Sequence, residues 1–597
     1  MRGTGRRQRG RLRSFGKLGL LLAVPLASLA ARTNAFAQDQ GAIGAPAPAA
    51  GPPAPGIAVP LPAGPPAPGI AAPLPATAPG GPQGLPILAA PTPAAVGPPV
   101  GVSVRLGNVE SAIAAASAVG GILAPPAGLS VVPSLGLSEE YNSNIFDTST
   151  GQLSDVITNI NPGILINLST PSATGTLSYY PSVQFYAEHS SQNDVLQDLN
   201  GSLEAELLPR TLFLSVNAYA SQQSTTGGVV PGGLNTTSSS NRTTTIGFSV
   251  QPSFVHQFGD TGTLQITYSL QYSNQNGSAA TAPGATLPYF VPSHAVANYG
   301  SVSFTTGPSL GRFNDTVTAT GGLESGTGVL NGAYQFLVDN TLRFAVVRRV
   351  YVFGTFGYED LFYPSEPKIL IQDGVWAVGF TLTPKPDTSI TAGYGHFGGF
   401  NSPYLTATIA LSPRTTFAAT YSDTLGTSLQ FLQSALANTL VNPAGTPVNS
   451  QTGAPVLLTN QLLSLQSGVS RNAIFSASLI TTFPRDTVAL SVVNQQSKLV
   501  ANAPGTSGYS QRSWTGSIAW THALTPRLSA AAYLDGGETN SLAVGSGLTP
   551  VAGGQLSLVY QFTPTLTGSA LYGITNSWES SGNALQNIVI LALQKTF

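Results

Sequence analysis

The sequence predicts an all-β protein that folds as a closed antiparallel transmembrane β-barrel of about 22 strands, within a range of about 20 to 24. Three observations predict this fold class. Residues 131–597 alternate between apolar and small polar side chains, and their chain reversals fall into a short and a long class. Charged residues form only 8% of the chain, against about 25% in ordinary soluble domains.

The alternation is clearest in residues 264–273. One set of alternate positions holds Leu264, Ile266, Tyr268, Leu270 and Tyr272, and the other holds Gln265, Thr267, Ser269, Gln271 and Ser273. Since successive side chains of a strand point to opposite faces, every apolar group lies on one side. A soluble β-sandwich also alternates. The polar face here is mostly small and uncharged, which is typical of a water-filled lumen.

Ten short turns punctuate the pattern. Six contain proline, which presets the backbone for a reversal and lacks the N–H that a ladder needs; they lie at Pro209, Pro384, Pro413, Pro484, Pro526 and Pro564. The other four lie at Ser172–Thr174, Gly262, Gly311–Arg312 and Arg348–Arg349. The connections between them, such as 222–241 and 274–298, are longer and rich in Ser, Asn and Gly. Short turns on one side and long loops on the other are typical of outer-membrane barrels, with both barrel termini in the periplasm.

The first 130 residues predict export and a spacer. A basic segment, an apolar stretch and the small-x-small site at Ala35 and Ala37 predict a cleaved signal peptide over 1–37. Residues 38–130 are rich in Pro, Ala and Gly, with a 13-residue repeat at 51–63 and 64–76 and one possible short helix at 109–123. Dense proline predicts a disordered, polyproline-like periplasmic segment. Such a segment either docks a periplasmic partner or serves as a linker without one.

Composition and motifs exclude several classes of function. The chain has no cysteine, which excludes disulfides and thiolate metal sites. Removal of 1–37 takes away eight of the 24 Lys and Arg residues and leaves acids in excess, which argues against a nucleic-acid partner. The histidines are scattered, and HExxH and P-loop motifs do not occur. His189 next to Ser190 suggests a hydrolase only weakly, because neighbours in a strand face opposite ways. We therefore predict no enzyme, no cofactor and no metal.

The last strand carries a pattern linked to barrel assembly. In residues 587–597, apolar side chains alternate backwards from the terminal aromatic residue, at Phe597, Leu593, Leu591 and Val589. This pattern resembles the signal that the outer-membrane insertion machinery recognises, although Lys595 departs from it. The expected partners are therefore outer-membrane lipid and the barrel-insertion machinery.

The beginning of the barrel resembles a known family. Residues 132–146 (VPSLGLSEEYNSNIF) contain an aromatic-Asn-x-Asn-aliphatic-Phe step from Tyr141 to Phe146, and x-Pro-Arg-x turns recur further on. These features resemble the outer-membrane β-barrel porin 2 family and the outer-membrane barrels associated with exosortase and exopolysaccharide systems. The resemblance covers residues 131–597 and implies a role in the passage or assembly of a secreted polysaccharide.

One insertion interrupts the barrel pattern on the long-loop side, at 426–467. Leucines recur in it at helical spacing, and the candidate gating residues are Leu429, Leu432, Leu436, Leu440, Leu462 and Leu465. One hypothesis is that the segment folds into or over the mouth of the barrel and controls passage. The alternative is an exposed loop that packs on the rim.

A set of charged residues lies on or near the predicted strands, where charges avoid lipid. The candidate lumen charges are Glu188, Asp339, Arg343, Glu359 and Asp360. If enough acids line the lumen, the pore would favour cations or neutral solutes over polyanions. The alternative is that the acids pair locally with Arg210, Arg343, Arg348 and Arg349 and set no selectivity.

The sequence thus predicts a protein of the cell outer membrane that acts as a porin-like conduit, linked to export or assembly of a secreted polysaccharide. Its N-terminal arm would lie in the periplasm and contact polysaccharide-export components. The alternative is a structural or assembly anchor whose Pro-rich arm docks a periplasmic partner.

Overall fold

The structure is a computed structural model that describes residues 128–226, 241–282, 285–437, 439–441, 447–449, 463–539, 548–579 and 582–597. The predicted signal peptide, the Pro-rich segment up to residue 127 and the helix at 109–123 lie outside these residues. The first strand begins at Gly128, slightly before the predicted barrel boundary at 131. No helix among the described residues has the length and apolar character needed to cross a membrane.

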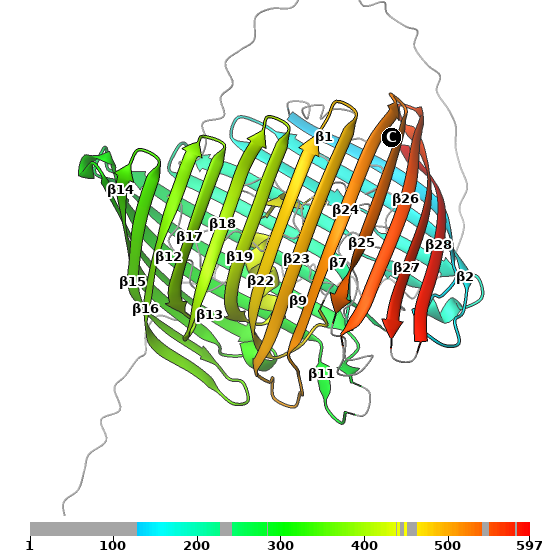
Figure 1. Cartoon of the computed structure of the whole chain (residues 1–597), viewed down its shortest axis with the longest axis horizontal. Helices are drawn as coiled ribbons and strands as arrows, with labels where there is room; N and C mark the ends of the chain where they lie inside the picture. The colour runs from blue at the N-terminus through cyan, green and yellow to red at the C-terminus, as the bar shows by residue number, and fades with distance from the viewer. Residues whose placement is uncertain are drawn as a thin grey trace, which may run out of the picture. The chain divides into compact units, whose positions relative to one another are not determined.

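The described residues form a closed antiparallel barrel of 22 strands, as the sequence predicts (Figure 1). Two of these strands are interrupted, β3 with β4 and β5 with β6, so the sheet has 24 segments. Its first half comprises β1 (Gly128–Asn142), β2 (Asp155–Ser169), β3 (Ala173–Tyr179), β4 (Ser182–Tyr186), β5 (Asp194–Leu196), β6 (Leu199–Leu208), β7 (Leu212–Ser224), β8 (Arg242–Gln257), β9 (Gly262–Gly277), β12 (Ser293–Thr306), β13 (Phe313–Gly326) and β14 (Tyr334–Val347).

The second half completes the ring. It comprises β15 (Val350–Tyr363), β16 (Ile369–Lys385), β17 (Thr388–Phe397), β18 (Phe400–Ser412), β19 (Thr415–Gly426), β22 (Val469–Thr482), β23 (Asp486–Ala501), β24 (Gln511–Thr525), β25 (Leu528–Thr539), β26 (Thr549–Thr563), β27 (Leu566–Glu579) and β28 (Gly582–Thr596). Connections contain the short strands β10 (Ala280–Thr281), β11 (Pro288–Phe290), β20 (Thr439–Val441) and β21 (Pro447–Asn449), and the helical elements η2 (Ser190–Gln192), η4 (Pro308–Leu310), η5 (Gly328–Leu330) and α3 (Ser428–Ala437).

The two ends of the barrel differ as the turn pattern predicts. Ten short turns lie at one end, which we call the short-turn end, at 170–172, 209–211, 258–261, 307–312, 348–349, 386–387, 413–414, 483–485, 526–527 and 564–565. The opposite, long-loop end carries most of the longer connections, although residues 398–399 make a two-residue hairpin there. Strand β1 begins and strand β28 ends at the short-turn end.

Strands β1 and β28 close the ring in an antiparallel pairing that runs from Ser134 opposite Thr596 to Asn142 opposite Ile588. We call this contact the seam. At the long-loop end, the Gln586 side-chain amide donates to Asn142 Oδ1 at 3.1 Å and to the Asn144 carbonyl at 2.7 Å. The Asn-x-Asn step of the first strand therefore joins the two ends of the sheet. Closure leaves no unpaired edge, as a membrane-spanning sheet requires.

The two faces of the wall differ in chemistry. On β1, large apolar side chains such as Leu135 and Leu137 are exposed on the outside, whereas Ser134 and Ser138 are buried on the inside. Exposed aromatic rings lie on the outside near both ends of the strands: Phe254, Phe258, Phe313, Trp520, Tyr560 and Phe562 at the short-turn end, and Tyr141, Tyr358, Trp514 and Trp578 at the long-loop end. An apolar outer band between aromatic girdles is typical of a barrel that spans a membrane.

Candidate functional site: the insertion inside the barrel mouth

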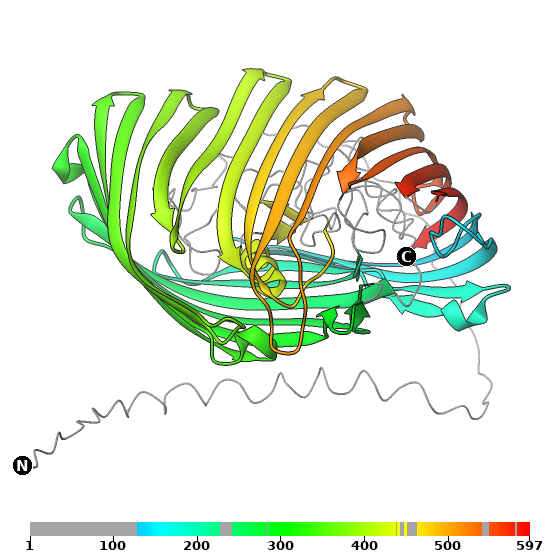
Figure 2. The same ribbon diagram turned by 60° about the horizontal axis from the view of Figure 1, so that its bottom comes forward.

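The insertion between β19 and β22 enters the barrel. Its helix α3 begins two residues after β19 ends and lies against the inner face of β7, β8 and β9 (Figure 2). The Gln433 side-chain amide donates to Ser273 Oγ on β9 at 3.0 Å, and Ser428 Oγ donates to Gln275 Oε1 at 3.3 Å. Further on, β20 lies beside β3 and β6. Since β8 is almost halfway around the ring from β19 and β22, the segment crosses the lumen.

The segment returns to β22 along the loops of the long-loop end. The Leu465 backbone N–H donates to the Thr225 carbonyl at 3.1 Å, and the Ser467 N–H donates to the Tyr289 carbonyl at 3.1 Å. The Ser464 N–H donates to Gln511 Oε1 at 2.8 Å. The returning segment is therefore hydrogen-bonded at three different parts of the ring, to the loops after β7 and β9 and to the first residue of β24.

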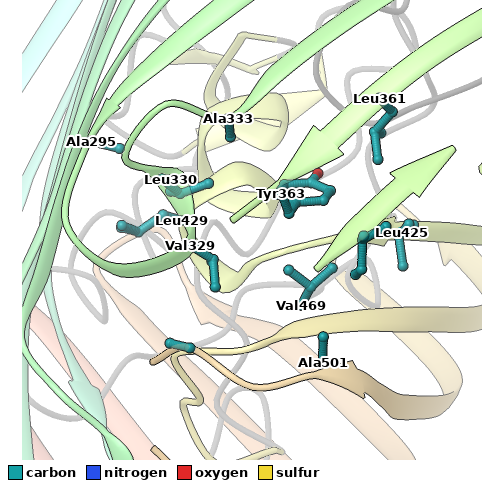
Figure 3. Close-up of a cluster of buried hydrophobic side chains, with 12 residues drawn as sticks. Ala295, Val329, Leu330, Ala333, Leu361, Tyr363, Leu425, Leu429, Val469 and Ala501 are labelled. Atoms are coloured by element: carbon teal, nitrogen blue, oxygen red, sulfur yellow. The ribbon is translucent and has the colours of Figure 1, made fainter. Parts of the chain in front are cut away.

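Apolar side chains from many strands meet inside the long-loop end, in a group that we call the mouth cluster (Figure 3). The cluster contains Ala295, Val329, Leu330, Ala333, Leu361, Tyr363, Ile369, Leu425, Leu429, Val469, Ala501 and Ala503. Leu429 contributes from α3, so this residue ties the helix to the ends of β15, β19, β22 and β23. Full burial of one leucine side chain stabilises by about 1.5–3 kcal/mol. The mouth cluster therefore stabilises the beginning of α3 inside the barrel.

A polar contact fixes the same turn of the helix. The Gln430 amide donates to Glu324 Oε1 on β13 at 2.8 Å, and the Tyr363 hydroxyl on β15 donates to Gln430 Oε1 at 3.0 Å. The Tyr299 hydroxyl on β12 also hydrogen-bonds Glu324 Oε1. Gln430 of α3 thus connects directly to two wall strands, β13 and β15, and the buried Glu324 carboxyl group accepts hydrogen bonds from two neutral side chains.

Loops also pair with one another across the mouth. Glu366, between β15 and β16, and Asn502, after β23, exchange two backbone hydrogen bonds of 2.9 and 3.0 Å. The Ser507 N–H donates to the Pro288 carbonyl at 2.9 Å. These contacts join loops that are several strands apart in the ring. The long-loop end therefore carries loops that are hydrogen-bonded to one another across the barrel.

The structure describes only part of the predicted gating residues. Leu429, Leu432 and Leu465 are 2%, 4% and 4% exposed, so they are buried inside the mouth rather than spread on the rim. Leu436 lies in α3 and Leu440 in β20, and their side chains are outside the described parts. Leu462 is outside the described residues.

Two of the predicted lumen charges share the inner face of β14. Asp339 and Arg343 alternate with the exposed Phe336 and Leu342 and therefore point inward. The Arg343 guanidinium lies 4.4 Å from the centre of the Tyr351 ring. In the described parts of the chain, no ion pair joins an acid to Arg210, Arg343, Arg348 or Arg349; the paired bases are His189, Arg242, His396, Arg471 and His522. The described residues therefore do not show the alternative in which the acids pair locally with these four arginines.

Glu359 also points inward but is not free in the lumen. Its side chain is fully buried, and its two oxygens accept the backbone N–H groups of Gly398 and Gly399, each at 3.1 Å. These glycines form the two-residue hairpin between β17 and β18, and both have positive φ angles of 61° and 76°. The carboxylate therefore stabilises a tight turn.

We expect Glu359→Ala to lower the free energy of unfolding, because two backbone amides lose their acceptor at about 1–3 kcal/mol for each buried unsatisfied group. Urea unfolding in lipid vesicles measures the effect. Glu359→Gln keeps one acceptor oxygen and should retain part of the stability. Asp360→Ala, at the adjacent outward position, is the matched control, and an equal loss there would contradict this role.

The remaining two charges do not lie in the lumen. Asp360 occupies the same face of β15 as the exposed Phe356 and Tyr358, so it points outward near the long-loop end and accepts a hydrogen bond from Gln372 at 3.2 Å. Glu188 is exposed in the loop between β4 and β5. The prediction that these two side chains lie in the lumen is therefore wrong: Asp360 lies on the outer face of β15, and Glu188 lies in a loop. The reason is strand parity for Asp360 and an earlier end of β4 for Glu188.

The histidines do not gather into a centre. His189 lies 2.9 Å from Asp155, His396 lies 3.0 Å from Asp373, and His522 lies 2.7 Å from Asp486. His189 and Ser190 lie in a loop and at the start of η2, not in a strand, so the strand argument for their separation does not apply. Among the described residues, no group of three or more His, Asp or Glu side chains is placed to hold a metal ion.

Glu324, Tyr299 and Gln430, which connect the helix to the wall, are not among the site residues predicted from the sequence. The pair Gln430 and Gln433 was the available signal, since residues three apart lie on one face of a helix. Their partners are more than 100 residues away along the chain, at Glu324 and Ser273, and no local pattern identifies them.

Comparisons with known proteins concern the fold. No family model and no curated protein sequence matches the chain. Among solved structures, the chain is similar to the FrpB iron transporter from Neisseria meningitidis (F5-1 variant), at 9% identity and a TM-score of 0.43 over 79% of this chain and 83% of that one. It is also similar to the siderophore receptor PirA from Acinetobacter baumannii, at 9% identity and a TM-score of 0.42 over 78% and 80%. The ferric-catecholate import receptor Fiu from E. coli K12 gives 10% identity and a TM-score of 0.43 over 78% and 82%. With identities and TM-scores this low, we infer nothing about function from these likenesses.

Proposed function

We propose that the chain is an outer-membrane conduit of the porin type, in which the segment 427–468 controls passage through the long-loop end. One observation carries this proposal. A 22-stranded barrel with a polar inner face holds an inserted segment that crosses the lumen from β19 and places its helix α3 against β7, β8 and β9. Barrels of about 16–18 strands already leave an aqueous channel, and barrels of about 22 strands commonly hold a plug inside. Strand β28, with Val589, Leu591 and Leu593 exposed on its outer face, would carry the signal for the barrel-insertion machinery.

The chemistry of the inner wall favours neutral, hydroxyl-rich solutes. A row of threonines in register crosses five strands, formed by Thr263, Thr305, Thr316, Thr341 and Thr355. Hydroxyl groups both donate and accept hydrogen bonds, as do the hydroxyls of a sugar. Together with the resemblance of residues 132–146, this lining supports export or assembly of a secreted polysaccharide as the biological role.

We expect a weak preference for cations over anions in planar bilayers. Asp339 and Asp535 point inward from β14 and β25, and in the described parts of the chain neither carboxyl group has a cationic partner. Carboxylates on the inner wall without cationic partners attract cations over a range of about 8–10 Å in physiological salt. The reversal potential in a salt gradient measures the preference.

Asp339→Asn should reduce this preference, whereas the outward Asp360→Asn should leave it unchanged. A clear preference for anions in the native protein would contradict the predicted lumen charge. A conductance that stays at the baseline of the lipid, even after removal of the insertion, would contradict the conduit itself.

The closed arrangement of the loops favours a second function. Since Glu366 and Asn502 pair across the long-loop end, the barrel would also suit an anchor whose Pro-rich arm docks a periplasmic partner. An anchor predicts little conductance and copurification of a partner that is lost when residues 41–99 are deleted. A conduit predicts conductance that does not depend on those residues.

A further inference from the structure

The wall on which α3 lies carries uncharged hydrogen-bonding groups on its inner face. Four inward side chains stand side by side in register on consecutive strands, namely Ser202 on β6, Asn217 on β7, Ser249 on β8 and Gln271 on β9. The inward residues Ser273 and Gln275 continue this surface on β9 toward the long-loop end. We call this surface the amide wall. None of these residues is charged.

Several groups of the amide wall have no hydrogen-bond partner among the described residues. Asn217 lacks a partner for both side-chain atoms and Gln271 for Oε1. The hydroxyl of Thr243, which lies on the same inner face of β8 as Ser249, also lacks one. Asn217, Gln271 and Thr243 are only 2%, 3% and 1% exposed. Buried polar groups of folded proteins are nearly always paired, with protein or with ordered water. The unpaired groups on this wall therefore leave hydrogen-bonding capacity that a bound polar molecule would satisfy.

Helix α3 contacts this surface with the same kind of chemistry. Gln433 donates to Ser273 at 3.0 Å, and Ser428 donates to Gln275 at 3.3 Å. Gln433 Oε1, however, finds no partner among the described residues. The helix thus contacts the amide wall through its own amide and hydroxyl groups. These contacts satisfy only some of the hydrogen-bonding groups of the wall. A single exchangeable contact of this kind contributes little net free energy.

The strand tilt extends the surface along the barrel. Strands of a barrel tilt against its axis, so a row of residues in register climbs from one end toward the other. The row that contains Asn217 runs from Asn167 and Thr176, near the short-turn ends of β2 and β3, up to Ala297 and Glu324 at the long-loop end of β13. At its upper end, Glu324 is the residue that Gln430 of α3 contacts.

We propose that the amide wall of β6–β9 is a binding surface for a neutral, hydroxyl-rich chain, and that α3 occupies this surface when the chain is absent. Hydroxyl, amide and sugar groups each donate and accept, so a neutral polyhydroxylated chain satisfies groups that α3 leaves unpaired. A polyanion finds no cationic side chain in the row from Asn167 to Glu324. The inference deepens the proposed function, on which it rests, by naming the surface and the competing segment.

The test uses the purified full chain and two neutral probes, maltoheptaose and cellohexaose, with an anionic oligoalginate as contrast. Isothermal titration calorimetry measures binding without requiring an open pore. We expect a neutral probe to bind, and Asn217→Leu or Gln271→Leu to weaken it on the order of tenfold, equivalent to about 1.4 kcal/mol. Matched controls are Asn472→Leu and Gln495→Leu, inward amides on β22 and β23 across the barrel. These controls should change affinity little.

Competition by α3 gives a second and opposite effect. Gln433→Ala removes the contact to Ser273, so the neutral probes should bind several-fold more tightly. The inference is overturned if neither the native chain nor the Gln433→Ala variant binds a neutral probe, if the control variants weaken binding equally, or if oligoalginate binds as well. Conductance is recorded separately in bilayers. If the protein conducts but binds no saccharide, the proposed binding surface is wrong and the conduit proposal stands. If it binds saccharide but no variant conducts, only the conduit proposal is wrong.

Discussion

Replacing residues 429–465 with a short Gly-Ser linker is expected to raise the single-channel conductance several-fold. The deletion removes α3 from the wall of β7–β9, and it removes Leu429 from the mouth cluster and Gln430 from Glu324. A wall of this strand number encloses a wide lumen once nothing fills it. Planar bilayer recordings at fixed salt measure the change. Unchanged conductance and unchanged solute uptake would show that the segment does not restrict passage.

The opposite manipulation provides the control for misfolding. The chain has no cysteine, so Gln433→Cys and Ser273→Cys place two unique thiols where the helix meets β9. A short, cleavable thiol cross-linker should hold α3 on the wall and lower the conductance below that of the untreated protein. Reduction of the cross-linker should restore the conductance of the untreated protein. Each single cysteine variant should show neither effect. If the cross-linked protein conducts like the untreated one, movement of α3 away from β9 is not needed for passage.

The barrel was predictable because its signals are local. Each short turn carries its own proline, glycine or paired arginines, and each strand shows its own alternation. Ten turns therefore fix ten hairpins, and closure adds the remaining strands. The same parity argument, applied more strictly, also excludes one predicted site residue. Glu359 and Asp360 are neighbours in β15, so they cannot both face the lumen.

The site was predictable only in part, because its contacts are distant in the sequence. The leucine spacing from Leu429 to Leu436 predicts a helix, and α3 spans these residues. The wall that receives the helix depends on how the ring closes, since β8 comes close to α3 only in the closed barrel. Likewise, the partners of Glu359 are backbone amides at Gly398 and Gly399, which carry no side-chain signal.

The outer face of β26 offers a second large effect, on membrane stability. Leu556 lies at the middle of this strand and is 51% exposed on the outside. We expect Leu556→Lys to lower the free energy of unfolding by about 2–4 kcal/mol, which is the cost of a lysine at the middle of the bilayer on a barrel surface. Urea unfolding of the barrel in lipid vesicles, compared with Leu556→Ala, measures the cost of the charge apart from the loss of the leucine.

Depth along the same strand supplies the decisive control. Phe562 is also exposed on the outer face but lies at the short-turn end, in the aromatic girdle. A lysine near the interface keeps its ammonium group in water, so Phe562→Lys should cost only about 0–1 kcal/mol for the charge, relative to Phe562→Ala. A soluble barrel has water along its whole outer surface and would show no such gradient. Equal costs at both positions would therefore contradict a lipid-facing wall, and the conduit proposal depends on that wall.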